Sequence, residues 1–387
     1  MGLPYQTEDY DEGGGGTSTT IISTTSDPLT DLYNLEPNDT NSTAITTQME
    51  NNFKPSWWLD YTNTYANGSG HGQGSVAFYG GVLAPIGKVI LVPFNSSNIG
   101  ICDPTANNYS NGPAHGRGSG AFNGGVLAPN GKVILVPFSS IYIGIYDPIA
   151  NTYTNGPLHG KGANAFAGAV LAPNGKVILV PFSSSVVGIY DPISDTYTNG
   201  PIHGQPSGAG AFVGGVLAPN GKVILVPRNA SAVGIYDHIS NTYTNGPAHG
   251  QSGAAFAGGV LAPNGKVILV PRVSTVVGIY DPANNTYTSG PAHGQGFFVF
   301  SGGVLAPNGK VILVSANSTV IGIYDPIANT YTNGPSHGRG GDAFYGGILT
   351  FNGKIVLVPT NSTVVGIYGG GALVYQNDAL SPYFNKY

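Results

Sequence analysis

The stretch "GGVLAPNGKVILVPF" at residues 124–138 recurs along the chain in near-copies, and this repetition decides the fold. Successive copies are 44 residues apart, except for one step of 46. Self-similarity at a fixed period of this length is typical of a solenoid or a propeller. The copies begin at Gly80, Gly124, Gly168, Gly214, Gly258, Gly302 and Gly346.

One repeat, residues 121–160, divides into four short apolar stretches separated by turn residues. "AFNGGVLA" ends at "PNG", where Asn130 and Gly131 supply the positive φ angles of a two-residue hairpin. The β-branched "KVILVPF", then "IGIYDP" and "NTYTNGP", follow with polar turns between them. No stretch has the length or the period of a helix. The unit is therefore predicted to be a four-stranded antiparallel meander, which is one propeller blade.

The two ends of the array predict that the blades close into a ring. The seventh unit stops after its third strand, at "GIYGGG", and its missing fourth strand stands at the other end of the chain as "NTYANG", residues 63–68. A strand that completes the last blade leaves no free sheet edge. We therefore predict an all-β fold at residues 56–368, a seven-bladed β-propeller of four-stranded antiparallel blades whose last blade is closed by an N-terminal strand.

Composition narrows the classes of partner. Only 9% of residues are charged, against about a quarter in ordinary globular proteins, and the net charge of −5 comes without any basic run, which argues against nucleic acid binding. No apolar run approaches the ~18 residues of a membrane span. The acidic start "MGLPYQTEDYDE" lacks the apolar segment of a secretory signal peptide. The single cysteine, Cys102, replaces the tyrosine of "GIYDP" and is predicted to be a core substitution.

Two flanking segments do not share the repeat. Residues 1–55 are acidic and rich in Thr, a composition typical of an extended low-complexity arm, and we expect this arm to dock on other proteins of an assembly. Residues 369–387 are expected to form a tail that packs on the propeller.

A histidine recurs in the dipeptide "HG" after the fourth strand of each unit. We expect each imidazole to cap its local loop, because equivalent copies this far from the axis are too widely spaced to share a metal ion. Contact with a ligand or partner on that face, or a metal site, are the alternatives. The histidines are His71, His115, His159, His203, His249, His293 and His337.

A lysine likewise follows each turn between the first and second strands, on the face opposite the histidine loops. Charge pairing with the aspartates of the "DP" turns is the expected role. The alternative is a ring at the mouth of the central channel that binds an anion or an acidic partner. The lysines are Lys88, Lys132, Lys176, Lys222, Lys266, Lys310 and Lys354.

Residues that break the repeat are the place to look for chemistry, because catalysis needs unlike groups in unlike roles. Arg228 and Arg272 stand where Phe recurs, in adjacent blades near the turn after the second strand, and predict a small basic patch on the histidine face. His238 replaces a recurring Pro. No pair of carboxylates breaks the repeat. The sequence therefore predicts no catalytic residue, no bound metal and no cofactor, and a protein that is not an enzyme.

Four N-x-S/T sequons occupy one equivalent turn, between the second and third strands of four different units. This turn is expected to be exposed, so it offers candidate glycosylation sites. The asparagines are Asn95, Asn229, Asn317 and Asn361.

The stretch "IYDPIANTYTNGP" followed by "AFAGAVLAPNGKVILVP" resembles the kelch repeat. Tyr replaces the kelch Trp, and Gly-Gly opens the first strand rather than following the second. The motifs "LAPNGK", "VP" and "GIYDP", together with the C-terminal motif "LSPYFNK", resemble those of repeat proteins of algae and of large algal DNA viruses, such as the chlorella viruses. This resemblance implies a structural protein of a virion or a cell surface.

The leading hypothesis is accordingly a non-catalytic structural propeller of a large assembly, capsid-associated or displayed at a surface. The alternative is a carbohydrate-binding, lectin-like propeller whose partners are glycans. Repetition of weak sites around the ring would favour multivalent binding in that case.

Overall fold

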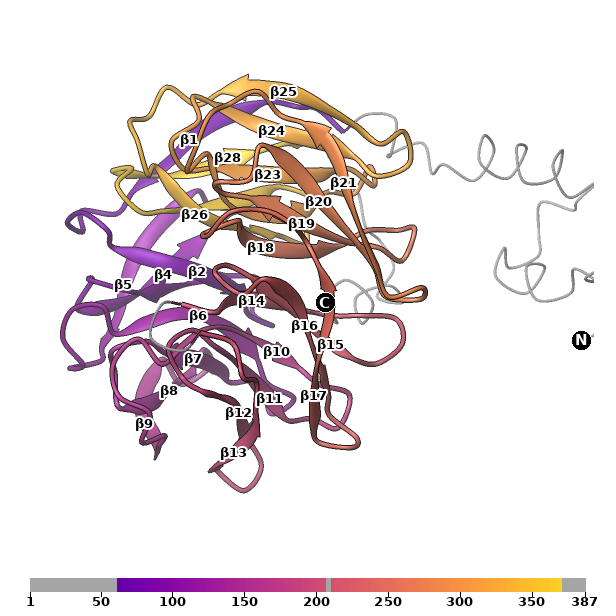
Figure 1. The fold of residues 1–387 in the computed structure, drawn as a ribbon. Helices are drawn as coiled ribbons and strands as arrows, with labels where there is room; N and C mark the ends of the chain where they lie inside the picture. Colours follow the sequence, from indigo (N-terminus) through magenta and orange to yellow (C-terminus); the bar gives the residue numbers. More distant parts are fainter. Residues whose placement is uncertain (1–60, 207–209, 371–387) are drawn as a thin grey trace, which may run out of the picture. The chain divides into compact units, whose positions relative to one another are not determined.

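The computed structural model describes residues 61–206 and 210–370, which form seven four-stranded antiparallel sheets (Figure 1). Six of these sheets are meanders in chain order, such as β2-β3-β4-β5, and the seventh has the order β1-β28-β27-β26. The predicted all-β fold is confirmed. The predicted arm at residues 1–55 and nearly all of the predicted tail lie outside the described residues. Within the described residues, no helix has the length and apolar character needed to cross a membrane.

The first and second strands of the blades carry the repeated hairpin. The first strands are β2 (Phe78–Leu83), β6 (Phe122–Leu127), β10 (Phe166–Leu171), β14 (Phe212–Leu217), β18 (Phe256–Leu261), β22 (Phe300–Leu305) and β26 (Phe344–Leu349). The second strands are β3 (Val89–Pro93), β7 (Val133–Pro137), β11 (Val177–Pro181), β15 (Val223–Pro227), β19 (Val267–Pro271), β23 (Val311–Ser315) and β27 (Ile355–Pro359).

The third and fourth strands lie farther from the axis. The third strands are β4 (Asn98–Asp103), β8 (Tyr142–Asp147), β12 (Val186–Asp191), β16 (Ala232–Asp237), β20 (Val276–Asp281), β24 (Val320–Asp325) and β28 (Val364–Tyr368). The fourth strands are β5 (Asn108–Ala114), β9 (Thr152–Leu158), β13 (Thr196–Ile202), β17 (Thr242–Ala248), β21 (Thr286–Ala292), β25 (Thr330–Ser336) and β1 (Tyr65–Gly70).

The blades close into a ring, as the ends of the array predict. The first strand of every blade contacts the first strand of the next, and β26 of the last blade contacts β2 of the first. The N-terminal strand β1 pairs antiparallel with β28, with Tyr65 opposite Tyr368, so it supplies the fourth strand of the last blade. In Figure 1 the indigo β1 lies among the yellow strands of the C-terminal part.

In several blades, glycine at the start of the repeated hairpin allows neighbouring first strands to approach closely at the axis. Gly124 has a φ of 82° and lies at a β-bulge between Phe122 and Gly125. A Cβ atom at Gly124 would come within 3.1 Å of the Cα atom of Gly168 in the next blade. Gly80 relates to Gly124 in the same way, also at 3.1 Å. A side chain here would force neighbouring blades apart, which explains why the repeat keeps this glycine.

One phenylalanine of each first strand lies in the core between blades, among aliphatic side chains of both blades. Phe122 is fully buried, and its ring lies so close to the third strand that a Cβ atom at Gly144 would be 2.9 Å from it. The same ring contacts His115 of the preceding blade and Tyr153 of its own, with centroid distances of 5.5 and 6.2 Å. Equivalent triads recur between the other blades. The ring closure has one too, formed by Tyr65, His337 and Phe344.

Polar side chains fix the turn between the third and fourth strands of a blade. Asp147 accepts hydrogen bonds from the backbone N–H groups of Ile149 and Ala150, which closes the turn between third and fourth strands. The buried Tyr146 donates its hydroxyl to Asn151, which has a φ of 53° in that turn. Cys102 stands at the equivalent of Tyr146 and is buried, as predicted for a core substitution, and burial raises the pKa of its thiol to about 12.

Candidate functional site

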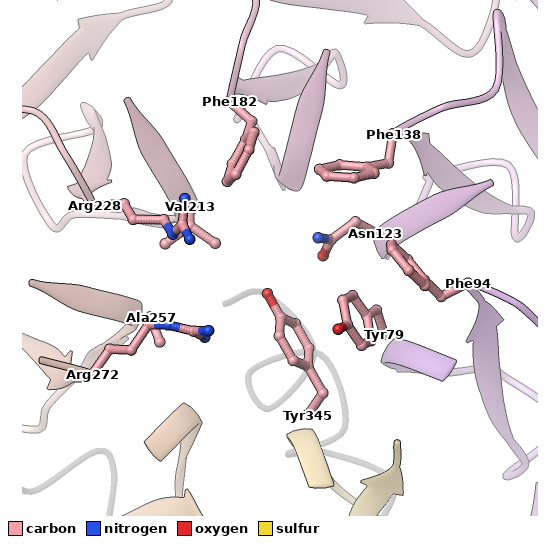
Figure 2. Close-up of a pocket in the computed structure, with 10 residues that line it drawn as sticks. All are labelled: Tyr79, Phe94, Asn123, Phe138, Phe182, Val213, Arg228, Ala257, Arg272 and Tyr345. Carbon is pink, nitrogen blue, oxygen red and sulfur yellow. The ribbon is translucent and has the colours of Figure 1, made fainter. Parts of the chain in front are cut away.

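A cavity of about 210 Å³ lies at the axis of the ring, on the face that carries the turns after the second strands (Figure 2). In an antiparallel meander this is also the face of the loops that join one blade to the next. Five blades contribute the second residue of their first strand. Five contribute the residue that follows the second strand. The lining residues are Tyr79, Phe94, Asn123, Phe138, Phe182, Val213, Arg228, Ala257, Arg272 and Tyr345.

Aromatic side chains form a continuous arc along one part of the wall. Tyr79 stacks on Tyr345 at a centroid distance of 4.1 Å and on Phe94 at 4.0 Å. The arc continues from Phe94 to Phe138 at 5.7 Å and from Phe138 to Phe182 at 5.3 Å. A wall of ring faces and edges in mutual contact offers a flat apolar surface to a ligand.

Two arginines complete the wall beyond this arc. Arg228 lies over the ring of Phe182, with its guanidinium carbon 4.9 Å from the centroid, and Arg272 lies over Phe298 at 5.4 Å. Neither arginine forms an ion pair with any carboxylate in the described parts of the chain. Nε of Arg272 is buried and has no hydrogen-bond partner there. Burial, and then the neighbouring charge of Arg272, lower the pKa of Arg228.

The loop that supports Arg272 places a bulky residue in an unusual backbone conformation. Phe298 has a φ of 56°, in the left-handed region, which the equivalent residues of other blades, such as Gly120 and Val76, also adopt. Glycine adopts this conformation without strain, whereas a large aromatic residue rarely does. Phe298 supplies the ring that holds the Arg272 guanidinium at the cavity.

Tyr79 is held in its neutral form. Burial, and then the neighbouring Tyr345, raise the pKa of its hydroxyl to about 12. The hydroxyl therefore stays protonated at neutral pH and can donate a hydrogen bond to a ligand.

The sequence identifies part of this site. It marks Arg228 and Arg272 as breaks in the repeat, and the structure brings both to the cavity. It misses Asn123 and the aromatic arc, although a signal was present. Residues 124–137 are nearly unchanged between copies, whereas the position just before them reads Tyr, Asn, Ala, Val, Ala, Ser, Tyr around the ring. The position after the second strand reads Phe, Phe, Phe, Arg, Arg, Ala, Thr.

The seven "HG" histidines lie elsewhere, buried beneath the loops between blades. Nε2 of His159 lies 2.8 Å from the carbonyl oxygen of Ser140, and its Nδ1 accepts a hydrogen bond from the backbone N–H of Lys161. The other six make the same pair of contacts. Both ring nitrogens are used, which is the loop-capping role that the sequence favours, and none of the seven lines the cavity. Within the described residues, no cluster of three or more His, Cys, Asp or Glu side chains could hold a metal ion.

The seven lysines lie on the opposite face, each just before a second strand. Three of them approach the aspartate of their own blade, at 3.6 Å for Lys176 and Asp191, 3.8 Å for Lys222 and Asp237, and 3.7 Å for Lys310 and Asp325. This is the charge pairing that the sequence favours. An acidic partner at this face stays a prediction.

The four sequon asparagines join neighbouring blades. Oδ1 of Asn95 accepts the backbone N–H of Gly120, and Oδ1 of Asn317 accepts that of Asp342. Asn229 and Asn361 make the equivalent bonds to Ala254 and Val76. Glycosylation of these residues stays a prediction.

Several solved structures, including lyases, have a fold similar to that of this chain. The fold resembles a streptogramin B lyase with a TM-score of 0.67 and 11% sequence identity over 81% of this chain and 99% of that one. It resembles virginiamycin B lyase from Staphylococcus aureus, solved as a catalytically inactive variant with quinupristin, with a TM-score of 0.68 and 12% identity over 80% and 99% of the two chains. It also resembles an extracellular domain of a one-component system from B. thetaiotaomicron, with a TM-score of 0.61 and 12% identity over 79% and 40%.

At these identities the likeness shows the fold alone. No family profile and no curated protein matches the sequence, so the comparisons support the propeller but neither the kelch nor the algal-virus resemblance. One expectation is corrected. The sequence predicts a protein that is not an enzyme, but propellers of this fold include lyases, which overturns that exclusion. The physical reason is that a near-identical repeat still leaves unlike side chains where its blades converge at the axis.

Proposed function

We propose that this propeller binds a small anionic, ring-bearing molecule in the axial cavity. The observation that carries the proposal is the pair Arg228 and Arg272, which lines the cavity without a carboxylate partner in the described residues. Figure 2 shows both guanidinium groups directed toward the centre of the cavity, across from Tyr79 and Asn123.

The electrostatics favour an anion between the two arginines. A guanidinium remains charged in proteins, so the half-buried pair places two like charges close together. Partly buried charge without a partner is costly, and a bound anion offsets that cost. The planar guanidinium also matches a carboxylate or phosphate through two parallel hydrogen bonds.

The cavity limits the size of the ligand. A cavity of about 150 Å³ accommodates benzene, so one of about 210 Å³ has room for a single substituted ring. The aromatic arc from Tyr345 to Phe182 supplies the surface on which that ring would lie.

Calorimetric titration at low ionic strength tests the proposal, with small carboxylates and inorganic phosphate as ligands. Arg228→Ala and Arg272→Ala should each weaken anion binding by at least about tenfold, because a hydrogen bond to a charged group contributes roughly 1.5–3 kcal/mol. Arg117→Ala is the matched control, since Arg117 lies over Tyr142 and does not line the cavity. Added salt should weaken binding to the native protein.

Two results would contradict the proposal. One is the absence of anion binding by the native protein. The other is equal affinity in the native protein and in both cavity variants.

The structural role in a virion or at a cell surface, with partners reached through residues 1–55, stays a prediction of the sequence. Its support is the algal-virus resemblance of the repeat. Quantitative mass spectrometry of purified particles tests it, because a structural component keeps a fixed stoichiometry to the capsid or wall protein.

A further inference from the structure

The cavity contains polar groups that a simple anion would leave unsatisfied. The side chain of Asn123 is buried, with 6% of its surface exposed, and has no hydrogen-bond partner among residues 61–206 and 210–370. Figure 2 shows its amide directed into the cavity. The hydroxyl groups of Tyr79 and Tyr345 also have no partner in these ranges.

These groups face the open cavity, so a ligand that displaces water from them has to offer both donors and acceptors. An amide offers two N–H donors and a carbonyl acceptor, and a phenol offers a donor and an acceptor. Leaving such groups buried and unpaired is unfavourable, so a tightly bound ligand must satisfy them. Hydroxyl groups around a saturated ring do so, because each can donate and accept. An unsubstituted aromatic acid such as benzoate offers a carboxylate alone, and with that carboxylate between the arginines it leaves the Asn123 amide unpaired.

The apolar wall fits the same kind of ligand. A hexose ring presents polar hydroxyls at its rim and C–H groups on its faces. The Tyr79 ring, held between Tyr345 and Phe94 at centroid distances of 4.1 and 4.0 Å, is fixed in place as a surface for such a face. Aromatic side chains combined with a few placed polar groups are typical of small-molecule sites.

We propose that the ligand is an acidic monosaccharide of the uronic acid class. Its carboxylate lies between Arg228 and Arg272, its hydroxyls bond to Asn123 and to the tyrosine hydroxyls, and one face of its ring lies on the aromatic arc. This inference rests on the proposed function and adds the chemical class of the ligand to it.

The repeat itself provides the variant for the test. Ala167 and Ala257 occupy the position of Asn123 in two other blades, so Asn123→Ala places a side chain that this fold already accepts there. The variant removes the amide and leaves both arginines and the aromatic arc in place.

The experiment is a calorimetric titration of the native protein and of Asn123→Ala with D-glucuronate, D-galacturonate, D-glucose and benzoate. The native protein should bind at least one uronate about tenfold more tightly than either glucose or benzoate, because only the uronate satisfies both the arginines and the amide. Asn123→Ala should lose about tenfold in uronate affinity and keep its affinity for benzoate unchanged.

The outcomes separate the two proposals. Benzoate binding as tightly as the uronates, or equal losses for both in Asn123→Ala, would overturn the sugar acid while leaving anion binding intact. Absence of binding by every acid tested would overturn the anion site itself, and the sugar acid with it.

Discussion

Two regions of the ring follow opposite rules. Inside the blades, equivalent positions carry the same residue around the ring, such as the fully buried Phe122, Phe166 and Phe212. At the axial cavity, equivalent positions carry unlike residues, with Phe182 in one blade and Arg228 in the next. Identical residues at equivalent buried positions allow every blade to pack against its neighbour in the same way. Variation at the cavity lets a nearly symmetric scaffold present an asymmetric site.

The largest expected effect contrasts one phenylalanine from each region. Phe166→Ala removes a fully buried ring that contacts His159 and Tyr197, and it should lower the free energy of unfolding by about 3–5 kcal/mol. Phe182→Ala removes a half-buried ring at the cavity and should cost only about 1–2 kcal/mol. Urea denaturation measures both, with a check that different probes report the same transition.

Anion affinity should show the reverse order. Phe182→Ala removes the ring beneath Arg228 and should weaken anion binding about threefold, since such a stacked pair contributes roughly 0.5–1 kcal/mol. Phe166→Ala should leave the affinity of the folded protein unchanged. Equal losses of stability in the two variants would remove the distinction between the regions.

The blade interior was predictable because its information is local and repeated. The Asn130-Gly131 turn, the alternation of turn residues with β-branched strands, and the displaced fourth strand together specify seven blades and their closure. Arg228 and Arg272 were visible as exceptions to the repeat. The sequence did not show that Asn123 lines the same cavity as these arginines. That placement depends on which side chains the β-bulge at Gly124 turns toward the axis. That direction is a property of the closed ring.

We expect the protein to lose stability in mild acid because of its buried histidines, and we expect this effect to be moderate in size. Burial lowers the pKa of His115, His159, His203 and His337 below the ordinary value of about 6.5, so the unfolded chain takes up these protons first. These histidines therefore do not lower the free energy of unfolding above about pH 6.5, and the free energy of unfolding decreases as the pH falls below that value. A proton on Nδ1 of His159 would also displace the N–H that Lys161 donates to it.

Urea midpoints at about pH 7.5 and pH 5.0, on either side of the ordinary histidine pKa, measure this dependence. His203→Gln removes one of the four histidines whose pKa is lowered, and it should reduce the difference between the two urea midpoints. A midpoint that does not change between these two pH values would contradict the lowered pKa values of these histidines in the folded protein.

The smallest effect is expected on the face opposite the cavity. Lys176 pairs with Asp191 at 3.6 Å, but the two side chains are 44% and 27% exposed, so Lys176→Ala should cost under about 1 kcal/mol. Lys132→Ala is the matched control, because Lys132 has no carboxylate within ion-pair distance among the described residues. The difference between the two variants in urea denaturation measures the contribution of the ion pair to stability.

Neither variant should change anion affinity, since the lysines lie on the face of the ring opposite Arg228 and Arg272. A loss of anion binding in both lysine variants would instead place the anion at the lysine ring, and the contrast between a uniform scaffold and a single asymmetric site would fail.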